Sequence, residues 1–277
     1  MTGVPGPNTP GQWGDLRARV ISGVAMAAIA LGGLAVGGLP WAGLLLAAAV
    51  GLAVEWAMLT TGQADGAGAA VLGTTLGAAV IAFLAGWPIA AMGILGLGGL
   101  LVLVWQRQPL LLLGVPCIGA GVLGLLWLRA DPVVGLANVL FVIVVVCGSD
   151  IGAYITGRAV GGRKLAPAIS PGKTISGALG GLVFAAIAGL LVAGWASWQG
   201  MDGNILRAAG LAVLLALVAQ AGDLAESWLK RLVGAKDSSQ LIPGHGGLLD
   251  RLDALLAVAP IAAILALGLG RGVLLWR

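Results

Sequence analysis

The residues able to do chemistry are concentrated in two short stretches of a chain that is otherwise almost wholly apolar. Residues 150–173 and 223–253 hold 14 of the 26 charged residues within 55 of the 277 positions, and the second stretch also holds the single histidine, His245. Charged side chains are costly in so apolar a chain. Their concentration therefore indicates a site for binding or reaction where the two stretches meet.

The polar residues of 223–253 follow helical spacing. Asp250 and Asp253 lie three residues apart in the first turn of a predicted helix, where acidic side chains are favourable against the helix dipole. The run 243–247 reads Pro-Gly-His-Gly-Gly and can approach a ligand closely, because glycine has no side chain. Five residues share one face of the preceding predicted helix, at i, i+3, i+4, i+7 and i+8: Asp223, Glu226, Ser227, Lys230 and Arg231.

This combination of acids and cations is typical of phosphoryl or nucleotidyl transfer. Carboxylates from different helix ends suit a hard divalent cation such as Mg²⁺, which binds one or two carboxylates together with phosphate oxygens of a substrate. Positioning and charge neutralisation supply most of the catalysis in such sites. The alternative, a salt bridge at a membrane interface, stays open for any single residue. The cations that suit an anionic ligand are Lys230, Arg231, Lys236, His245 and Arg251.

The first stretch adds a second set of polar residues. Asp150, Tyr154 and Arg158 share a helical face at i, i+4 and i+8. Lys173 and Thr174 come at the start of a predicted helix, whose N-terminus attracts phosphate. The Gly-Lys-Thr triplet at 172–174 is not a P-loop, because position 167, where that motif needs its first glycine, is a proline.

Membrane-spanning helices must position these residues. The mean hydropathy is +1.04, with 59% hydrophobic and 9% charged residues, whereas soluble domains carry about 25% charged residues. The sequence therefore predicts an all-α polytopic membrane protein. Apolar runs bounded by Gly, Pro, Trp and charge predict about nine spans, at 18–37, 41–61, 68–86, 88–105, 110–129, 133–157, 175–197, 205–231 and 252–274.

The distribution of cations predicts the orientation of these spans. With nine spans, eleven of the fifteen Lys and Arg residues lie on the side of the N-terminus; the other four are Arg129, Arg207, Arg271 and Arg277. The positive-inside rule places the richer side in the cytoplasm. This predicts a multi-pass protein of a bacterial-type inner (plasma) membrane with cytoplasmic active-site loops. We divide the chain into a polar segment (1–17), scaffold helices (18–131) and a catalytic membrane domain (132–277).

Glu55 is a lone acid inside the second predicted span. We expect a hydrogen-bonded structural role for it, with a place on a substrate path as the alternative. The pI near 9.6 rests on a net charge of only +4, which favours contact with anionic lipid headgroups over nucleic acid.

The order of the polar residues resembles the signature of the phosphatidate cytidylyltransferase (CDP-diacylglycerol synthase) family. The resemblance rests on specific motifs over residues 150–253. Before residue 150 it rests mainly on the apolar composition. Gly172 and Ser176 depart from the family pattern, because many members carry Lys and Glu at these positions. Shorter matches are Gln220-x-Gly222-Asp223, Asp150-x-x-Ala153-Tyr154 and Ile169-Ser170-Pro171-x-Lys173-Thr174. The longest match, over 27 residues, is Ser227-x-x-Lys230-Arg231-x4-Lys236-Asp237 followed by Pro243-x-His245-Gly246-Gly247-Leu248-x-Asp250-Arg251-x-Asp253.

The resemblance implies a reaction in which CTP and phosphatidic acid give CDP-diacylglycerol and pyrophosphate, with Mg²⁺. A monovalent cation beside the Mg²⁺ stays open. It implies Asp223 and Asp250 as metal ligands with Asp253 close by, and a substrate pocket completed by Asp150, Tyr154, Arg158, Lys173 and Thr174. Together with the glycine-rich helix faces, it favours a homodimer. Phosphates would be bound by Ser227, Lys230, Arg231, Lys236, His245 and Arg251, with Asp237 in the same motif.

Three other functions remain as alternatives. A lipid or polyprenol kinase would transfer the terminal phosphoryl group and leave a nucleoside diphosphate. A CDP-alcohol phosphotransferase is disfavoured, because its aspartate-rich motif continues beyond the first D-x-x-D pair and no aspartate follows Asp253. A membrane transporter is the non-enzymatic alternative, although transporters place polar residues near the middle of the bilayer, and here they gather at one predicted face.

Overall fold

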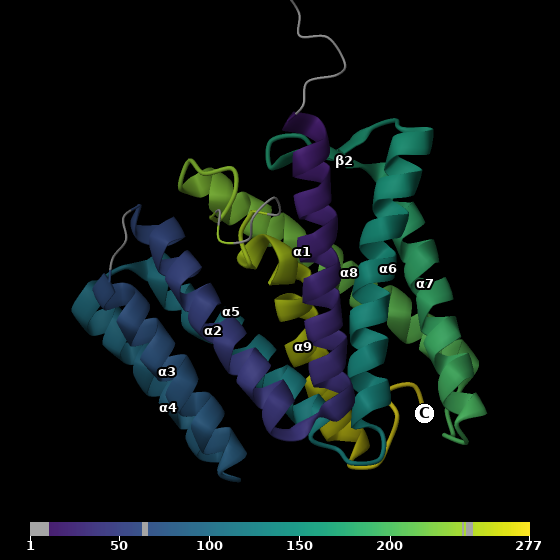
Figure 1. Cartoon of the computed structure of the whole chain (residues 1–277), viewed down its shortest axis with the longest axis horizontal. Coiled ribbons are helices and arrows are strands. Elements are labelled where there is room, and N and C mark those ends of the chain that lie inside the picture. The colour runs from purple at the N-terminus through teal and green to yellow at the C-terminus, as the bar shows by residue number, and fades with distance from the viewer. Residues whose placement is uncertain (1–10, 63–65, 240, 242–245) are drawn as a thin grey trace, which may run out of the picture.

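The architecture comes from a computed structural model that describes residues 11–62, 66–239, 241 and 246–277, without the side chains of 11–21 and 106. The described residues are mainly helical (Figure 1). The elements are α1 (Gly11–Val36), α2 (Gly38–Thr61), α3 (Gly66–Leu84), α4 (Pro88–Leu101), the π-helix η1 (Val102–Gln106), α5 (Pro109–Arg129), α6 (Gly135–Val160), β1 (Lys164–Ala166), β2 (Ser170–Thr174), α7 (Ile175–Trp198), α8 (Ile205–Leu232) and α9 (Leu249–Leu269).

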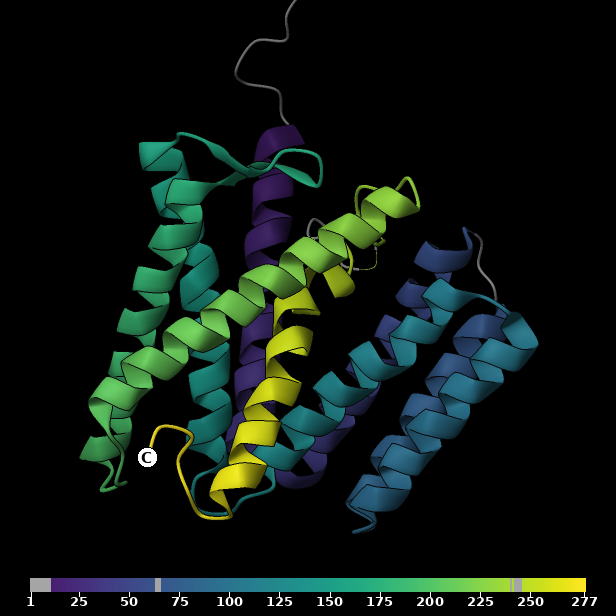
Figure 2. The same ribbon diagram turned by 180° about the vertical axis from the view of Figure 1, so that it is seen from behind.

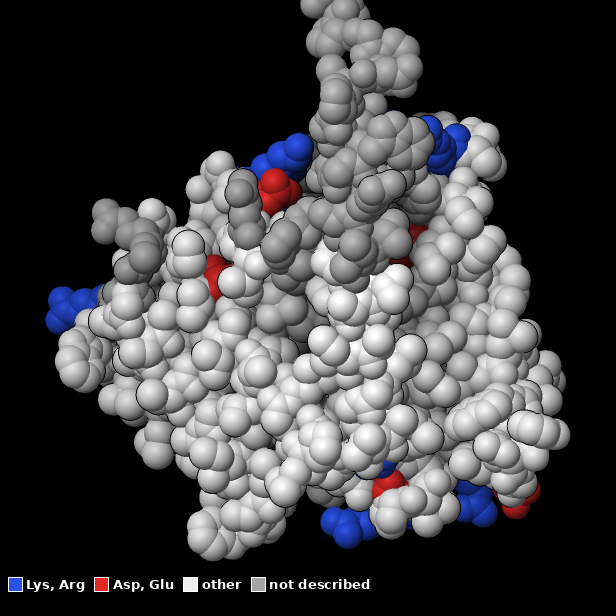
Figure 3. Space-filling view, in the orientation of Figure 1, with Lys and Arg blue, Asp and Glu red and all other residues white. Residues whose placement is uncertain are grey.

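The predicted all-α membrane class is confirmed. Among the described residues, eight helices are long and apolar enough to cross a membrane, and α1 contributes a shorter apolar segment, Ser22–Val36. On the face drawn in Figure 3, most charged side chains lie toward two opposite ends of the molecule, with a broad uncharged band between them. This distribution is the one expected of helices that cross a bilayer.

Two predicted boundaries were wrong. Helix α1 begins at Gly11, seven residues before the predicted start at 18. Helix α9 ends at Leu269 instead of 274, because Gly270 takes a φ of 93° that a helix cannot continue. The remaining residues turn back onto α6, where the side-chain carbonyl of Asn138 accepts a hydrogen bond from the Leu275 amide and the Trp276 ring stacks on Phe141 at 4.4 Å.

The helices form two groups that meet along α5 and α9. Helices α2 to α5 pack on one another, as do α6 to α9, and α6 packs most extensively on α7. Helix α1 stands between α2 and α6, and α8 crosses the back of the second group obliquely (Figures 1 and 2). The strands and the C-terminal end of α8 lie at one end of the molecule, and the chain's C-terminus lies at the other.

Glycine allows the α5–α9 contact. A methyl group at Gly124 would lie 2.8 Å from the carbonyl oxygen of Ala259, and one at Gly121 would lie 3.0 Å from the Cα of Leu256. Small residues let helix backbones approach closely in membranes. The two groups of helices are therefore held together by direct backbone packing.

Replacing Gly124 with Ala is expected to force α5 and α9 apart and to lower the free energy of unfolding by about 2 kcal/mol. The matched control is Gly194→Ala in α7, because a methyl group there meets no atom within 4 Å and alanine is the better helix former. Thermal unfolding in detergent would measure both variants. Equal stability of the two variants would contradict the close packing.

A β-hairpin occupies the connection between α6 and α7, where the sequence predicted no regular element. Lys164 pairs with Thr174 and Ala166 with Ser170 in an antiparallel ladder. The pairing brings β2 directly to the start of α7, where the Thr174 hydroxyl caps the helix by accepting a hydrogen bond from the Gly177 amide at 3.0 Å. The hairpin thus fixes where Lys173 lies.

Candidate active site

A cavity of about 520 Å³ brings together polar residues from α6, β2 and α8, and small residues of α7 complete its wall. Its lining includes every residue of the first stretch that was predicted to bind substrate, together with one predicted metal ligand. Gly157, Gly177 and Ala178 form parts of its wall that carry little or no side chain, so a ligand can approach the backbone there. The polar residues in the lining are Asp150, Tyr154, Arg158, Ser170, Lys173, Thr174, Gln220 and Asp223.

One ion pair and one hydrogen bond link polar side chains of this cavity. The Lys173 ammonium lies 2.5 Å from a carboxylate oxygen of Asp223, and each side chain keeps about a third or less of its surface exposed. The Arg158 guanidinium donates to the Tyr154 hydroxyl at 3.1 Å. Lys173 precedes the capped N-terminus of α7, which carries the positive end of the helix dipole. The cavity therefore offers two cations and a helix N-terminus to an anionic ligand.

A second cluster lies where α8 meets the start of α9. The Lys230 ammonium is 2.7 Å from both Glu226 and Asp250. The Asp250 carboxylate also accepts hydrogen bonds from the Ser238 amide and hydroxyl and from the Gly247 amide, at 3.0 to 3.3 Å. Lys230 is thus shared by two acids, and Asp250 ties the segment after α8 to the start of α9.

Glu55 reaches this second cluster from α2. It is only 1% exposed, and its carboxylate accepts hydrogen bonds from the backbone amides of Leu248 and Leu249 at 2.8 and 2.7 Å. The hydroxyls of Ser238 and Ser239 donate to the same carboxylate at 3.4 and 2.5 Å. The hydrogen-bonded role expected for Glu55 is confirmed, and the carboxylate supplies the N-terminal cap that α9 does not find in its own side chains.

Three carboxylates from three helices act on one another. The negative charge of Asp223 on α8 reaches both Asp150 on α6 and Asp253 on α9. Carboxylate oxygens are the donors that a hard cation such as Mg²⁺ prefers. In the described part of the chain, however, no three acidic, His or Cys side chains are close enough to hold a metal ion as they stand. Asp250 directs its carboxylate to hydrogen-bond donors, so the metal ligands Asp223, Asp250 and Asp253 stay a prediction.

Comparison with known proteins places this arrangement in a family. The family model described as "Cytidylyltransferase family" matches residues 17–268, which cover both groups of helices and both clusters. The chain belongs to the cytidylyltransferase family.

Individual relatives agree with this family. The chain is 51% identical over 143 residues to the phosphatidate cytidylyltransferase of Brucella suis, a match that covers 52% of each protein. It is 43% identical over 164 residues to that of Haemophilus influenzae, covering 56% of this chain and 57% of the relative. It is 44% identical over 151 residues to that of Pseudomonas aeruginosa, covering 54% of each. The chain spans about half the length of the curated relatives it matches.

The remaining residues of the cytidylyltransferase signature lie outside the cavity and outside the Lys230 cluster, or outside the described part of the chain. Arg231 donates hydrogen bonds to the carbonyl oxygens of Ile169 and Ala235, so it links α8 to the hairpin instead of facing the cavity. Ser227 is partly buried on α8. His245 lies outside the described residues. Three further signature residues have exposed side chains in the segment after α8 and at the start of α9: Lys236, Asp237 and Arg251.

Two residues that the sequence analysis did not assign to the site belong to it. The Gln220 amide lines the cavity and donates to the Ala178 carbonyl at 3.0 Å. Ser238 is 7% exposed and hydrogen-bonds both Asp250 and Glu55. Gln220 extends the polar face of α8 by one turn, so its spacing was a usable signal. Ser238 follows Asp237 in a segment without periodicity, and no pattern distinguishes it from a solvated loop serine.

Replacing Glu55 with Ala is expected to lower the free energy of unfolding by about 3 kcal/mol. The amides of Leu248 and Leu249 and the Ser239 hydroxyl lose their buried acceptor, whereas the Ser238 hydroxyl keeps Asp250. Turnover should fall with it, since Asp250 loses the neighbour that holds Ser238. Glu55→Gln keeps one acceptor oxygen and should give a smaller loss. Thermal unfolding in detergent measures the stability. An alanine variant as stable as the wild type would contradict the anchoring role.

Proposed function

We propose that this chain transfers a cytidylyl group from CTP to phosphatidic acid, giving CDP-diacylglycerol and pyrophosphate. The observation that carries the proposal is the cavity in which Lys173 and the N-terminus of α7 face the carboxylates of Asp223 and Asp150. The names of the matched relatives support the same reaction. The cavity lies at the end of the helices, where a lipid phosphate and a nucleotide from water can meet.

The bond changes make modest demands on the protein. A phosphate oxygen of phosphatidic acid attacks the α-phosphorus of CTP, and the bond from that phosphorus to the bridging oxygen of the β-phosphate breaks. Pyrophosphate leaves with that oxygen. The attacking oxygen is already anionic at neutral pH, so no strong general base is required. The protein must mainly bring two anions together and neutralise their charge.

The residues of the cavity suit this task. Lys173 can exchange its contact with Asp223 for a contact with substrate phosphate, and the α7 N-terminus offers backbone amides to the same charge. Tyr154 and Arg158 lie along the α6 wall, where they can orient the nucleotide or the lipid headgroup. The Lys230 ammonium pairs with Asp250 and fixes this carboxylate at the start of α9.

We infer that Mg²⁺ is the cofactor and that Asp223 and Asp253 would hold it, with Asp250 joining once its carboxylate gives up some of its present donors. When bound, the ion would neutralise phosphate charge and favour the departure of pyrophosphate. A monovalent cation beside it is also part of the proposal. The support is the electrostatic interaction of Asp223 on α8 with the carboxylates of Asp150 on α6 and Asp253 on α9.

The proposal extends to location and assembly. We infer a bacterial inner membrane, with the hairpin and the loop after α8 in the cytoplasm, because Lys and Arg are more numerous on that side. The apolar helices and the bacterial relatives support a multi-pass membrane protein. A homodimer is proposed from the family resemblance, and the mass of the purified protein in a defined micelle would test it.

An isotope experiment tests the reaction. Purified protein in detergent would be given phosphatidic acid, Mg²⁺ and CTP labelled at either the α- or the γ-phosphate. Entry of the α label into lipid with release of pyrophosphate is the expected result. Entry of the γ label would instead indicate a lipid kinase. If neither label enters lipid although a cooperative thermal unfolding transition shows that the protein is folded, phosphatidic acid is not the acceptor.

A further inference from the structure

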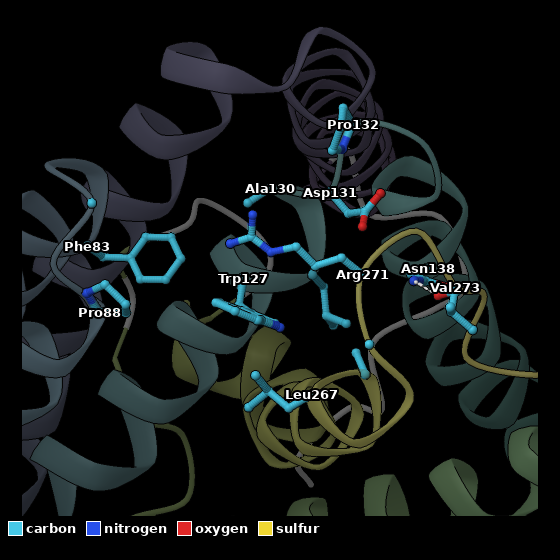
Figure 4. Close-up of a pocket in the computed structure, with 14 residues that line it drawn as sticks. Phe83, Pro88, Trp127, Ala130, Asp131, Pro132, Asn138, Leu267, Arg271 and Val273 are labelled. Atoms are coloured by element: carbon cyan, nitrogen blue, oxygen red, sulfur yellow. Dashed lines mark hydrogen bonds between the residues drawn. The ribbon is translucent and has the colours of Figure 1, made fainter.

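A second cavity lies at the opposite end of the molecule from the candidate active site. It has a volume of about 400 Å³ and lies between the turn from α3 to α4, the C-terminal ends of α5 and α9, and the start of α6 (Figure 4). Its wall combines apolar and aromatic side chains with two charged ones. The residues that matter here are Phe83, Trp127, Asp131, Leu267 and Arg271.

Arg271 supplies a cation with unused hydrogen-bonding capacity. Its guanidinium carbon lies 5.7 Å from the centre of the Trp127 ring, a cation–π contact. Among the described residues it has neither a hydrogen-bond acceptor nor an ion-pair partner. By contrast, Arg129 donates to the carbonyl oxygens of Leu34 and Ala35, and Arg207 donates to that of Arg277. Arg271 can therefore offer its donors in a fork that matches phosphate oxygens.

Asp131 supplies the opposite charge on the other side of Arg271 (Figure 4). Its carboxylate accepts three backbone hydrogen bonds, at 2.6 to 3.0 Å, from the amides of Val133, Val134 and Gly272. Burial alone would raise the pKa of Asp131, but these bonds and the charge of Arg271 lower it. Asp131 is thus an anion at neutral pH, and the cavity's two ionisable lining residues sum to zero charge.

The surroundings favour an amphiphile over a soluble ion. The cavity lies at the ends of helices that are long and apolar enough to cross a bilayer, so we place it where a bilayer meets water. Its aromatic side chains, Phe83 and Trp127, are the kind that settle at headgroup depth. Below it on α9, Leu267 and Ile264 are 56% and 63% exposed and lie one turn apart, so they continue the cavity as an apolar track. A bound molecule with a charged head and a hydrocarbon tail would match both parts.

We propose that this cavity binds the headgroup of a zwitterionic phospholipid, with its phosphate on Arg271 and its ammonium group toward Asp131. The acyl chains run along α9 past Leu267 and Ile264. An anionic headgroup satisfies Arg271 equally well but meets the Asp131 carboxylate without a cation, so it binds less tightly. The site is separate from the cavity lined by Lys173 and Asp223 and does not depend on the reaction proposed there.

Native mass spectrometry of the delipidated full-length protein would test the proposal. The protein would be titrated with phosphatidylethanolamine, with phosphatidylglycerol of the same chains, and with soluble glycerophosphoethanolamine. Arg271→Gln is expected to weaken retention of phosphatidylethanolamine about tenfold. Arg207→Gln, the same charge change at the same end of the molecule, should leave it unchanged. Asp131→Asn should remove the preference for phosphatidylethanolamine over phosphatidylglycerol.

Several results would overturn the assignment. Equal retention by the Arg271→Gln and Arg207→Gln variants would show that Arg271 does not hold the phosphate. Equal binding of phosphatidylglycerol by the wild type would exclude the zwitterionic preference. Binding of glycerophosphoethanolamine as tight as that of the lipid would exclude a role for the acyl chains. If Arg271→Gln does not fold, Arg271→Lys, which keeps the charge but loses the fork and the stacking, should still weaken retention severalfold.

Discussion

Replacing Asp223 with Asn is expected to lower kcat for the proposed cytidylyl transfer by about a hundredfold or more, with little change in stability. Asp223 is the acid paired with Lys173, and its charge also reaches Asp150 and Asp253. Asparagine keeps the size of the side chain but removes the charge on which both the lysine and the proposed cation depend. The side chain is about a third exposed, so the loss of its ion pair costs little folding free energy.

The matched control is Asp202→Asn, because Asp202 is an exposed aspartate in the connection from α7 to α8. Initial rates with labelled CTP, at several Mg²⁺ concentrations, would measure both variants. A residual rate that recovers at high Mg²⁺ would support weakened metal binding, whereas a Mg²⁺-independent loss would point to the Lys173 contact. Near-normal turnover of the Asp223 variant would remove this residue from the active site.

Replacing Lys230 with Met is expected to produce the largest loss of stability, about 3 to 5 kcal/mol, because it leaves buried acids without their cation. The side chains of Lys230, Glu226 and Asp250 are 12%, 6% and 13% exposed, and both ion pairs measure 2.7 Å. One carboxylate oxygen of Glu226 already has no hydrogen-bond partner among the described residues. Because these side chains are largely shielded from solvent, water would compensate poorly for the missing ammonium group.

A double-mutant cycle makes this prediction sharper. Asp250→Asn alone should also lower the free energy of unfolding. The double variant should lose less stability than the sum of the two single losses, since each substitution removes the same ion pair. Lys164→Met, an exposed lysine in the hairpin, is the control and should change the free energy of unfolding by less than about 0.5 kcal/mol. Additive losses in the cycle would mean that Lys230 and Asp250 do not interact.

The helices were largely predictable because apolar runs in a membrane chain end where Gly, Pro or charge appears. The first-stretch site was also predictable, since Asp150, Tyr154 and Arg158 recur at helical spacing and do line one wall of a cavity. The spacing of residues along the sequence could not predict which charged side chains pair with one another. Lys173 pairs with Asp223 only because the hairpin β1–β2 carries it across to α8, and hairpin pairing depends on contacts that no local pattern encodes.

The sequence also did not predict that residues of the second stretch divide between two environments, a buried acidic cluster and the main chain of the hairpin. Helical spacing placed Arg231 beside Lys230, yet Lys230 binds buried acids and Arg231 binds main-chain oxygens of the hairpin side. Lys230 and Arg231 are consecutive on α8, so they point in directions about 100° apart around the helix axis and meet different neighbours. The binding partner of Glu55, some 190 positions away along the chain, could be found only from the packing of α2 against the start of α9.

The Glu55 contact limits how this protein can be rearranged by recombination. The predicted division at 131/132 suggests that a catalytic half could be exchanged between homologues with its scaffold half left behind. Yet the backbone amides that open α9 find their acceptor on α2, in the other half. A chimera must therefore inherit α2 and the 238–249 segment from the same parent, and substitutions at position 55 and at 238–239 should be inherited as a set.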